Sequence, residues 1–258
     1  TRGGFREFNA AERWVKVEPG VVLGDLNRWL APHRLQFGPE TSTANRCCMG
    51  GMLGNNSCGA HSIIHGSVRD HILEVDAVLS DGSEAHFCAL TTEEFNSKCA
   101  GDPALLETMI YRNLRDILSD TRNAEEIRKE YPHSGLRRRN NGYAIDTLLD
   151  TDPFTGNGEK INICKLLAGS EGTLAFTVSM KLNLVPITLV QGQVDAAVPW
   201  EPYTAQVIRE LGANAAVVSR GEASLVSDLI GVVANEDYIK KNQDLLEKFS
   251  TGIAQATQ

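Results

Sequence analysis

The stretch that decides the fold runs from Phe37 to Gly59 and reads FGPETSTANRCCMGGMLGNNSCG. It is dominated by glycine and by small polar residues. Glycine lets backbone N–H groups approach a ligand closely, and it allows turns with positive φ in which several N–H groups point one way. Such concave turns bind phosphate. Arg46 is the one cationic residue of the stretch, so backbone amides would supply most of the binding.

Known phosphate-binding fingerprints do not describe this stretch. It contains no G-K-[ST], which excludes a Walker loop, and GGMLG at 50–54 lacks the G-x-G-x-x-G spacing of a Rossmann fold. Thr41, Ser42, Asn55, Asn56 and Ser57 add neutral donors that can bond a phosphate or a heterocycle. A glycine-rich surface turn without any ligand is the alternative interpretation of GGMLG taken alone.

The flanking sequence predicts a mixture of strands and helices. Alternation predicts a strand at 13–18, broken by Pro19-Gly20, and a hairpin with strands at 73–79 and 84–88 around a turn at 80–83. Asp25 is expected to cap a helix over 26–30, residues 103–131 to be helical with Asn123 capping a second helix to Glu130, and 174–184 to form a strand. Beyond Pro186 the pattern predicts strands at 189–198 and 215–219 and helices at 202–211, 223–233 and 238–249.

Composition excludes several classes of protein. The 258 residues carry a formal net charge of −8, which argues against nucleic acid as a partner. No apolar run approaches the roughly 18 residues of a transmembrane helix. The six Cys include no C-x-x-C pair and the His show no metal spacing, so reduced thiols, a cytoplasmic location and no metal site are expected.

Three blocks in order carry a family resemblance. They are the segment 37–82, the segment RRNNGYAID at 138–146 and the segment LLAGSEGTLAFT at 166–177. Together they resemble the PCMH-type FAD-binding domain of the vanillyl-alcohol oxidase superfamily. Within it they are most similar to bacterial FAD-linked oxidases allied to D-lactate and D-2-hydroxyglutarate dehydrogenases. The resemblance runs from about residue 6 to 186.

The resemblance implies a fold and a domain organisation. The expected class is α+β, with a two-subdomain FAD-binding domain at 1–186 and part of an α/β, ferredoxin-like substrate or cap domain at 187–258. The family's upstream glycine-rich phosphate loop has no counterpart in the chain, because Arg2-Gly3-Gly4 lies too close to Pro19. We therefore expect a fragment whose partner segments lie beyond both ends.

The resemblance also implies an activity. It is oxidation of a D-2-hydroxy acid by hydride transfer to N5 of a non-covalent FAD, with electrons passing to a quinone, a cytochrome or an electron-transfer protein rather than to NAD. An iron–sulfur cluster is expected only in a C-terminal region beyond this chain, and the full-length protein could associate peripherally with the inner membrane. A non-catalytic flavin-binding module and a flavin-dependent reductase of cell-wall nucleotide-sugar synthesis remain as alternatives.

Candidate site residues follow from the matched blocks, and none of them is assigned as catalytic. The cofactor-binding candidates are Pro39, Glu40, Thr41, Ser42, Gly50, Gly51, Asn55, Ser57, Cys58, Gly59, Gly66, Gly169, Glu171, Gly172, Thr177 and Val178. Arg138, Arg139 and Tyr143 are candidates for substrate binding, because arginine binds a carboxylate through two parallel hydrogen bonds. A solvated basic turn is the alternative interpretation of the arginine cluster.

Overall fold

The computed structural model describes residues 4–59, 62–132, 136, 139–140 and 142–187, and beyond them 196–197, 208–209, 215–219, 232–235, 240–241, 243–245, 247–248 and 251. The chain divides into two compact units, Thr1–Val185 and Pro186–Gln258. Helices and antiparallel strands are both present, which confirms the α+β class.

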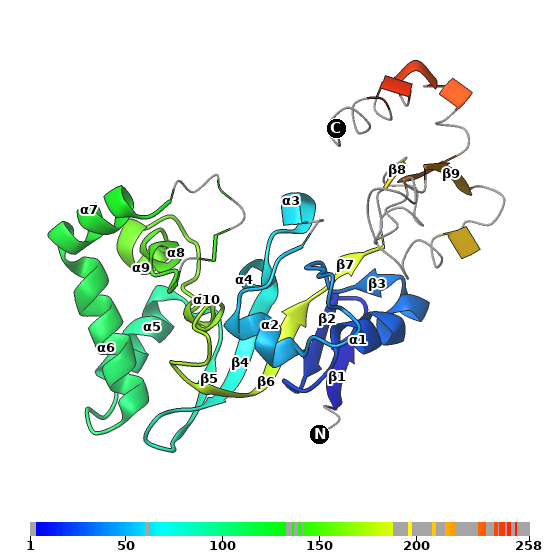
Figure 1. Ribbon diagram of the computed structural model, residues 1–258. Coiled ribbons are helices and arrows are strands. Elements are labelled where there is room, and N and C mark those ends of the chain that lie inside the picture. Colours follow the sequence, from blue (N-terminus) through cyan, green and yellow to red (C-terminus); the bar gives the residue numbers. More distant parts are fainter. Residues whose placement is uncertain are drawn as a thin grey trace. The chain divides into compact units, whose positions relative to one another are not determined.

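An antiparallel sheet organises the first unit. Among the described residues, five strands follow the order β1-β2-β6-β4-β5 (Figure 1). They are β1 (Phe5–Asn9), β2 (Trp14–Val17), β4 (Ile72–Val78), β5 (Glu84–Phe87) and β6 (Phe176–Asn183). β6 lies between β2 and β4, although about 160 residues separate it from β2 and about a hundred from β4. The predicted hairpin is confirmed: Asp81 accepts a bond from Ser83 N at 2.9 Å, and Gly82 supplies the positive φ of the turn.

Four helices lie next to this sheet. They are α1 (Leu23–Leu30), α2 (Met49–Gly54), α4 (Val68–His71) and α10 (Cys164–Leu167) (Figure 1). Short elements nearby are η1 (Ala31–His33), β3 (Leu35–Gln36), α3 (Ser62–His65) and, at the end of the unit, β7 (Val185–Pro186). The predicted cap of the first helix is wrong: α1 begins at Leu23 after Val22, and Asp25 lies in its first turn, where its charge still favours the helix dipole.

A helical group lies at the β5 end of the sheet. It contains α5 (Thr92–Ala100), α6 (Leu106–Ser119), α7 (Thr121–Glu130), α8 (Asp146–Leu149) and α9 (Asp152–Thr155) (Figure 1). No helix is predicted at α5, although Thr91 and Glu94 form a capping box at its start. The cap of α7 is Asp120, which accepts bonds from Arg122 N and Asn123 N, so the prediction that Asn123 caps it is wrong.

The second unit contains β8 (Ala196–Ala197), β9 (Ala215–Ser219) and β10 (Val232–Asn235). Among its described residues these strands form an antiparallel sheet in the order β8-β10-β9. β9 agrees with the predicted strand at 215–219. The helix predicted over 223–233 is wrong at its end, because Val232 and Val233 belong to β10. Pairing with β9 overrides the apolar pattern that suggested a helix. The other elements predicted here lie largely outside the described residues.

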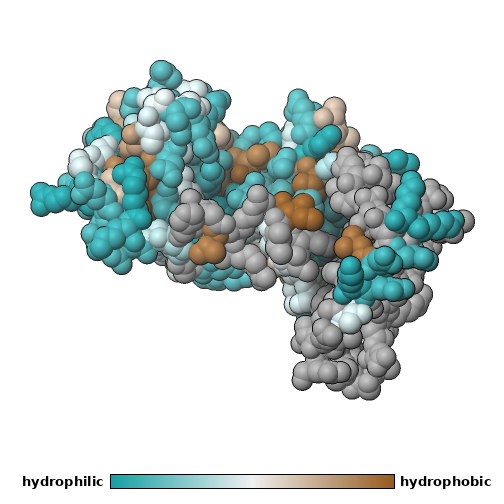
Figure 2. Space-filling view, turned by 90° about the horizontal axis from the view of Figure 1, so that it is seen from above, coloured by the Kyte–Doolittle hydropathy of each residue, from teal (hydrophilic) through white to brown (hydrophobic). Residues whose placement is uncertain are grey.

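The described residues on the face drawn in Figure 2 are mainly hydrophilic. Figure 2 shows hydrophobic residues scattered among hydrophilic ones in small groups, as is normal for folded proteins. In the part of the chain that the structure describes, no helix combines the length and apolarity needed to span a bilayer.

Candidate functional site

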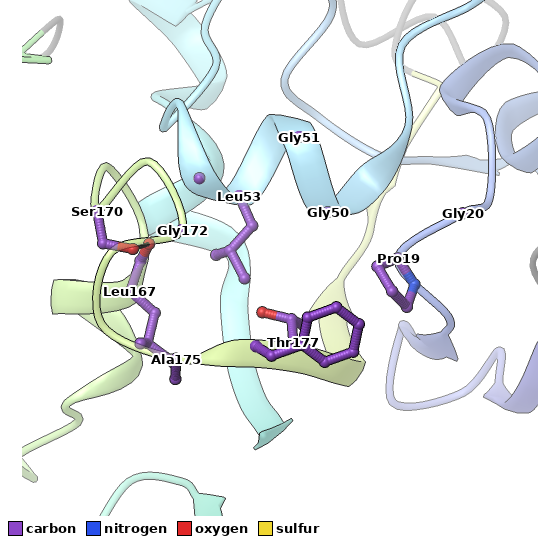
Figure 3. A pocket seen from close by; sticks show the side chains of 12 residues that line it. Pro19, Gly20, Gly50, Gly51, Leu53, Leu167, Ser170, Gly172, Ala175 and Thr177 are labelled. Atoms are coloured by element: carbon purple, nitrogen blue, oxygen red, sulfur yellow. Dashed lines mark hydrogen bonds between the residues drawn. The ribbon is translucent and has the colours of Figure 1, made fainter. Parts of the chain in front are cut away.

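A cleft of about 440 Å³ opens within the first unit, where the blocks 37–82 and 166–177 meet the turn at Pro19-Gly20. Figure 3 shows α2 with Gly50 and Gly51 on one side and the start of β6 with Thr177 facing it. The turn at Pro19-Gly20 lies at one end and the loop with Ser170 and Gly172 at the other. The lining residues are Pro19, Gly20, Gly50, Gly51, Leu53, Gly54, Leu167, Ser170, Gly172, Ala175, Phe176 and Thr177.

The lining carries no charged side chain, and its polar groups are backbone amides and carbonyls and the hydroxyls of Ser170 and Thr177. Among the described residues, no acceptor receives the backbone N–H of Gly20, Gly51 or Gly172. Gly51 and Gly172 are exposed and Gly20 is half-buried, so these N–H groups are open to solvent and can donate to an incoming oxygen atom. Three unpaired amides in a neutral cleft suit an oxygen-rich anion such as a diphosphate.

Gly50 and Gly51 of α2 lack a side chain for different physical reasons. A Cβ on Gly50 would lie 2.6 Å from Cβ of Pro19, so this glycine lets α2 pack against the Pro19 turn. A Cβ on Gly51 would meet nothing within 4 Å. Glycine costs a helix about 1 kcal/mol relative to alanine, and the packing of the protein gives no reason for this cost at Gly51. A ligand that occupies the cleft against the backbone supplies the missing reason.

The loop that closes the cleft is docked onto the end of α2. Gly169 N donates to Leu53 O at 3.0 Å, and Glu171 N donates to Gly54 O at 2.9 Å. These bonds satisfy carbonyls that the C-terminus of a helix otherwise leaves unpaired. Gly169, Glu171 and Gly172 all have positive φ, at 98°, 51° and 74°. The loop is therefore tightly turned, and α2 holds it in place.

The structure brings part of the predicted cofactor set into this cleft. Gly50, Gly51, Gly172 and Thr177 line it. Gly169 and Glu171 belong to its closing loop, with Glu171 exposed. Val178 follows Thr177 in β6 but is not part of the lining.

The remaining cofactor candidates lie outside the lining and contact one another or neighbouring turns. Gly59 packs directly on Glu40, because a Cβ there would lie 1.3 Å from the Glu40 carbonyl oxygen. Thr41 Oγ1 bonds Cys47 Sγ at 3.3 Å, and Asn55 donates to Ser57 Oγ at 3.0 Å. The other members of this group are Pro39, Ser42, Cys58 and Gly66. Whether any of them contacts the cofactor stays a prediction.

Two of the three residues predicted to bind the substrate, Arg139 and Tyr143, are paired with other side chains of the protein. Arg139 forms an ion pair with Asp146, and both side chains are largely buried. The Tyr143 hydroxyl is paired with Thr173 Oγ1 at 2.7 Å, next to the loop of the cleft. Arg138 lies outside the described residues. The substrate role of these three residues stays a prediction, and so does the alternative of a solvated basic turn, since Arg139 is paired with an acidic residue but is largely buried.

Sequence reasoning missed two thirds of the lining. Pro19, Gly20, Leu53, Gly54, Leu167, Ser170, Ala175 and Phe176 were not named as candidates. Pro19-Gly20 stood out only as the break after a strand. Phe176 is distinguished by its exposure: the residue is 71% exposed on a strand whose other residues are more covered. That exposure is visible only in the structure.

Comparison with known proteins finds relatives that share an FAD-binding domain. Residues 2–87 match the model of a family described as FAD binding domain. The chain is 36% identical to D-2-hydroxyglutarate dehydrogenase of Pseudomonas putida over 181 residues, which are 70% of this chain and 17% of that protein. It is 32% identical to the protein of the same name from Escherichia coli over 190 residues, or 73% of this chain and 18% of that protein.

Two weaker similarities were also found. The chain is 29% identical to a glycolate oxidase subunit of Escherichia coli over 76 residues, which are 30% of this chain and 15% of that protein. A solved alkyldihydroxyacetonephosphate synthase has a TM-score of 0.40 and 14% identity, covering 71% of this chain and 21% of that one. The chain spans about a sixth of the length of the D-2-hydroxyglutarate dehydrogenases. The family that the sequence resembles is thus confirmed, with residues 2–87 of this chain matching the FAD binding domain model.

Proposed function

We propose that this chain supplies the FAD-binding part of an oxidoreductase that oxidises a D-2-hydroxy acid of the D-2-hydroxyglutarate or D-lactate type. One observation carries the proposal: the neutral cleft at α2 has three unpaired amides and a glycine, Gly51, that the protein's own packing does not require. The names of the relatives, which are D-2-hydroxyglutarate dehydrogenases, support the substrate class.

The residues of the cleft fit the two chemical parts of FAD. The amides of Gly20, Gly51 and Gly172 would hold the diphosphate, and each charge-assisted hydrogen bond contributes about 1.5–3 kcal/mol. The exposed side chain of Phe176 offers apolar surface to a heterocycle. Stacking of a base on an aromatic ring contributes about 1–3 kcal/mol. The cleft therefore needs no lysine to bind FAD.

Bound FAD supplies an acceptor for the hydride on the α-carbon of the hydroxy acid, while the protein contributes binding, orientation and electrostatics. This chain's part in that division is to hold the cofactor by its phosphates and to keep water from the apolar side of the cleft. The proposed electron acceptor is a quinone, a cytochrome or an electron-transfer protein. The proton of the substrate hydroxyl is expected to leave to a base outside this chain.

Anaerobic flavin reduction tests the proposal. The full-length protein is loaded with FAD, and the flavin absorbance near 450 nm, about where oxidised flavins absorb, is followed after adding D-2-hydroxyglutarate, D-lactate or NADPH in separate samples. Bleaching by either acid supports the proposal. Bleaching by NADPH alone indicates a reductase, and no bleaching by any of them indicates a non-catalytic flavin module. The L-enantiomers of both acids serve as matched controls.

A further inference from the structure

A buried arginine outside the cleft ties together the segments that form it. Arg69, in α4, is 7% exposed. Its guanidinium donates to three backbone carbonyls: from Nε to Lys165 O at 3.1 Å, from Nη1 to Arg139 O at 3.3 Å and from Nη2 to Ala168 O at 2.6 Å. Burial lowers the pKa of Arg69, yet an arginine remains charged at any physiological pH. The planar, forked shape of the guanidinium is what allows one side chain to reach three acceptors.

Asn56 completes this junction from the glycine-rich stretch. Its side chain is fully buried, and its backbone is left-handed at φ 47°. Asn56 Oδ1 accepts from Arg69 N at 2.9 Å, and Nδ2 donates to Arg139 O at 3.2 Å. Arg69 and Asn56 therefore share one carbonyl, that of Arg139. The pair joins three stretches that are far apart in the sequence, around residues 56–69, 139–140 and 165–169.

The junction reaches the cleft through Gly169. Arg69 Nη2 bonds the carbonyl immediately before this residue, and a Cβ on Gly169 would lie 2.8 Å from the same nitrogen. The guanidinium thus packs against the first residue of the closing loop. On its other side, the loop is bonded to the carbonyls of Leu53 and Gly54 at the end of α2. The loop is clamped between α2 and Arg69, and two of its residues, Ser170 and Gly172, line the cleft.

Clamping matters because the loop has an unfavourable backbone. One of its three positive φ values is at Glu171, and a side chain with a Cβ makes positive φ unfavourable. Such conformations persist only where the surroundings hold them. The bonds of Arg69 and of the α2 carbonyls are what the structure provides for this purpose.

We propose that Arg69, supported by Asn56, is a positioning residue for the cofactor cleft, which holds the loop 169–172 so that Gly172 can bind the FAD phosphates. This inference rests on the proposed function. Arg69 itself does not line the cleft, so its effect on FAD passes through the loop.

The test compares two arginines with the same chemistry. Arg112 in α6 also donates to backbone carbonyls, to Cys99 O at 2.6 Å and Gly101 O at 3.0 Å, but it lies in the helical group away from the cleft. Arg69→Lys and Arg112→Lys both keep the charge and lose the fork. For each variant of the full chain, we would measure thermal unfolding, the FAD dissociation constant, and hydrogen exchange of residues 169–173 without FAD.

The expected result is a difference between the two variants. Arg69→Lys should weaken FAD binding at least tenfold and speed exchange at 169–173, whereas Arg112→Lys should keep FAD affinity within twofold of wild type and leave that exchange unchanged. If Arg69→Lys proves unfolded, Asn56→Ala, which keeps the guanidinium but removes its support, is expected to show the same two effects more weakly. Guanidinium ion in the millimolar range should partly restore FAD binding to Arg69→Ala.

Two outcomes would overturn the inference: wild-type FAD affinity in Arg69→Lys, or equal losses in both lysine variants. Failure of the proposed function would look different. If the wild-type chain did not bind FAD at all, exchange at 169–173 would still decide the positioning role, and unchanged exchange in Arg69→Lys would refute it.

Discussion

Replacement of Gly51 by valine separates the ligand-binding role of α2 from its structural role. A Cβ at Gly51 meets nothing within 4 Å, so a side chain there enters the open cleft and displaces no part of the protein. Gly51 also has an ordinary helical backbone, because its φ is not positive. We therefore expect Gly51→Val to fold normally.

Gly51→Val should change the stability of the fold little and the affinity for FAD strongly. Glycine in a helix costs about 1 kcal/mol relative to alanine and valine roughly half of that, so Gly51→Val should be neutral or slightly stabilising. The valine side chain would hold the phosphates away from the amides of the cleft. Loss of two charge-assisted hydrogen bonds at about 1.5 kcal/mol each removes about 3 kcal/mol of binding, or roughly 100-fold in affinity.

Two measurements on each variant check this reasoning: the flavin content after loading with FAD and the midpoint of thermal unfolding. Gly50→Ala is the matched control in the same helix, because its Cβ would lie 2.6 Å from Pro19. It should lower the unfolding midpoint as well as flavin content, whereas Gly51→Val should lower flavin content alone. Normal flavin stoichiometry in Gly51→Val would refute the assignment of the cleft to FAD.

Three further outcomes are expected. Phe176→Ala should weaken FAD binding about 5- to 100-fold through a loss of about 1–3 kcal/mol of stacking, with unchanged thermal stability because the ring is 71% exposed. Equal affinity in titrations of both proteins would exclude the stacking role. Arg139→Ala should lower the free energy of unfolding by about 3 kcal/mol, since it leaves the largely buried Asp146 carboxylate without its partner. Wild-type stability in chemical denaturation, combined with a raised KM, would instead favour a role of Arg139 in substrate binding. Burial alone would raise the pKa of Asp76, but Lys16 at 2.8 Å, with further hydrogen bonds from neighbouring side chains, holds it well below its ordinary value. A depressed pKa in the folded state stabilises the fold above the unfolded pKa of about 4 and loses that contribution as pH falls below it. Asp76→Asn should therefore be less stable than wild type at pH 7, with the difference shrinking in thermal unfolding at pH 3; a difference that is the same at both values would contradict the ion-pair argument.

Local sequence patterns predicted the sheet better than the helix ends. Alternation gave β2, β4 and β5 within a residue or two, because each of these strands has one buried and one polar face. The cap of α7 was misplaced by three residues, since Asp120 and Asn123 are both good capping residues and only the bonds from Arg122 N and Asn123 N distinguish them. β10 was read as the end of a helix because a short apolar run fits either structure.

The sequence by itself determined the chemical nature of the site. The glycines of the stretch 37–59, with Arg46 as its one cationic residue, pointed to binding through backbone amides, and three ordered blocks pointed to the family. These are local properties, since a glycine's freedom and a motif's spacing do not depend on distant neighbours.

Only the tertiary structure decided which residues share the cleft. The placement of β6 between β2 and β4 brings Phe176 and Thr177 opposite α2, and the antiparallel register also sets the Pro19 turn against Gly50. The same packing binds Arg139 to Asp146 and buries Arg69 among carbonyls from two distant segments. Long-range contacts of this kind depend on strand pairing and on the burial of unpaired polar groups, and neither can be read from the spacing of residues along the chain.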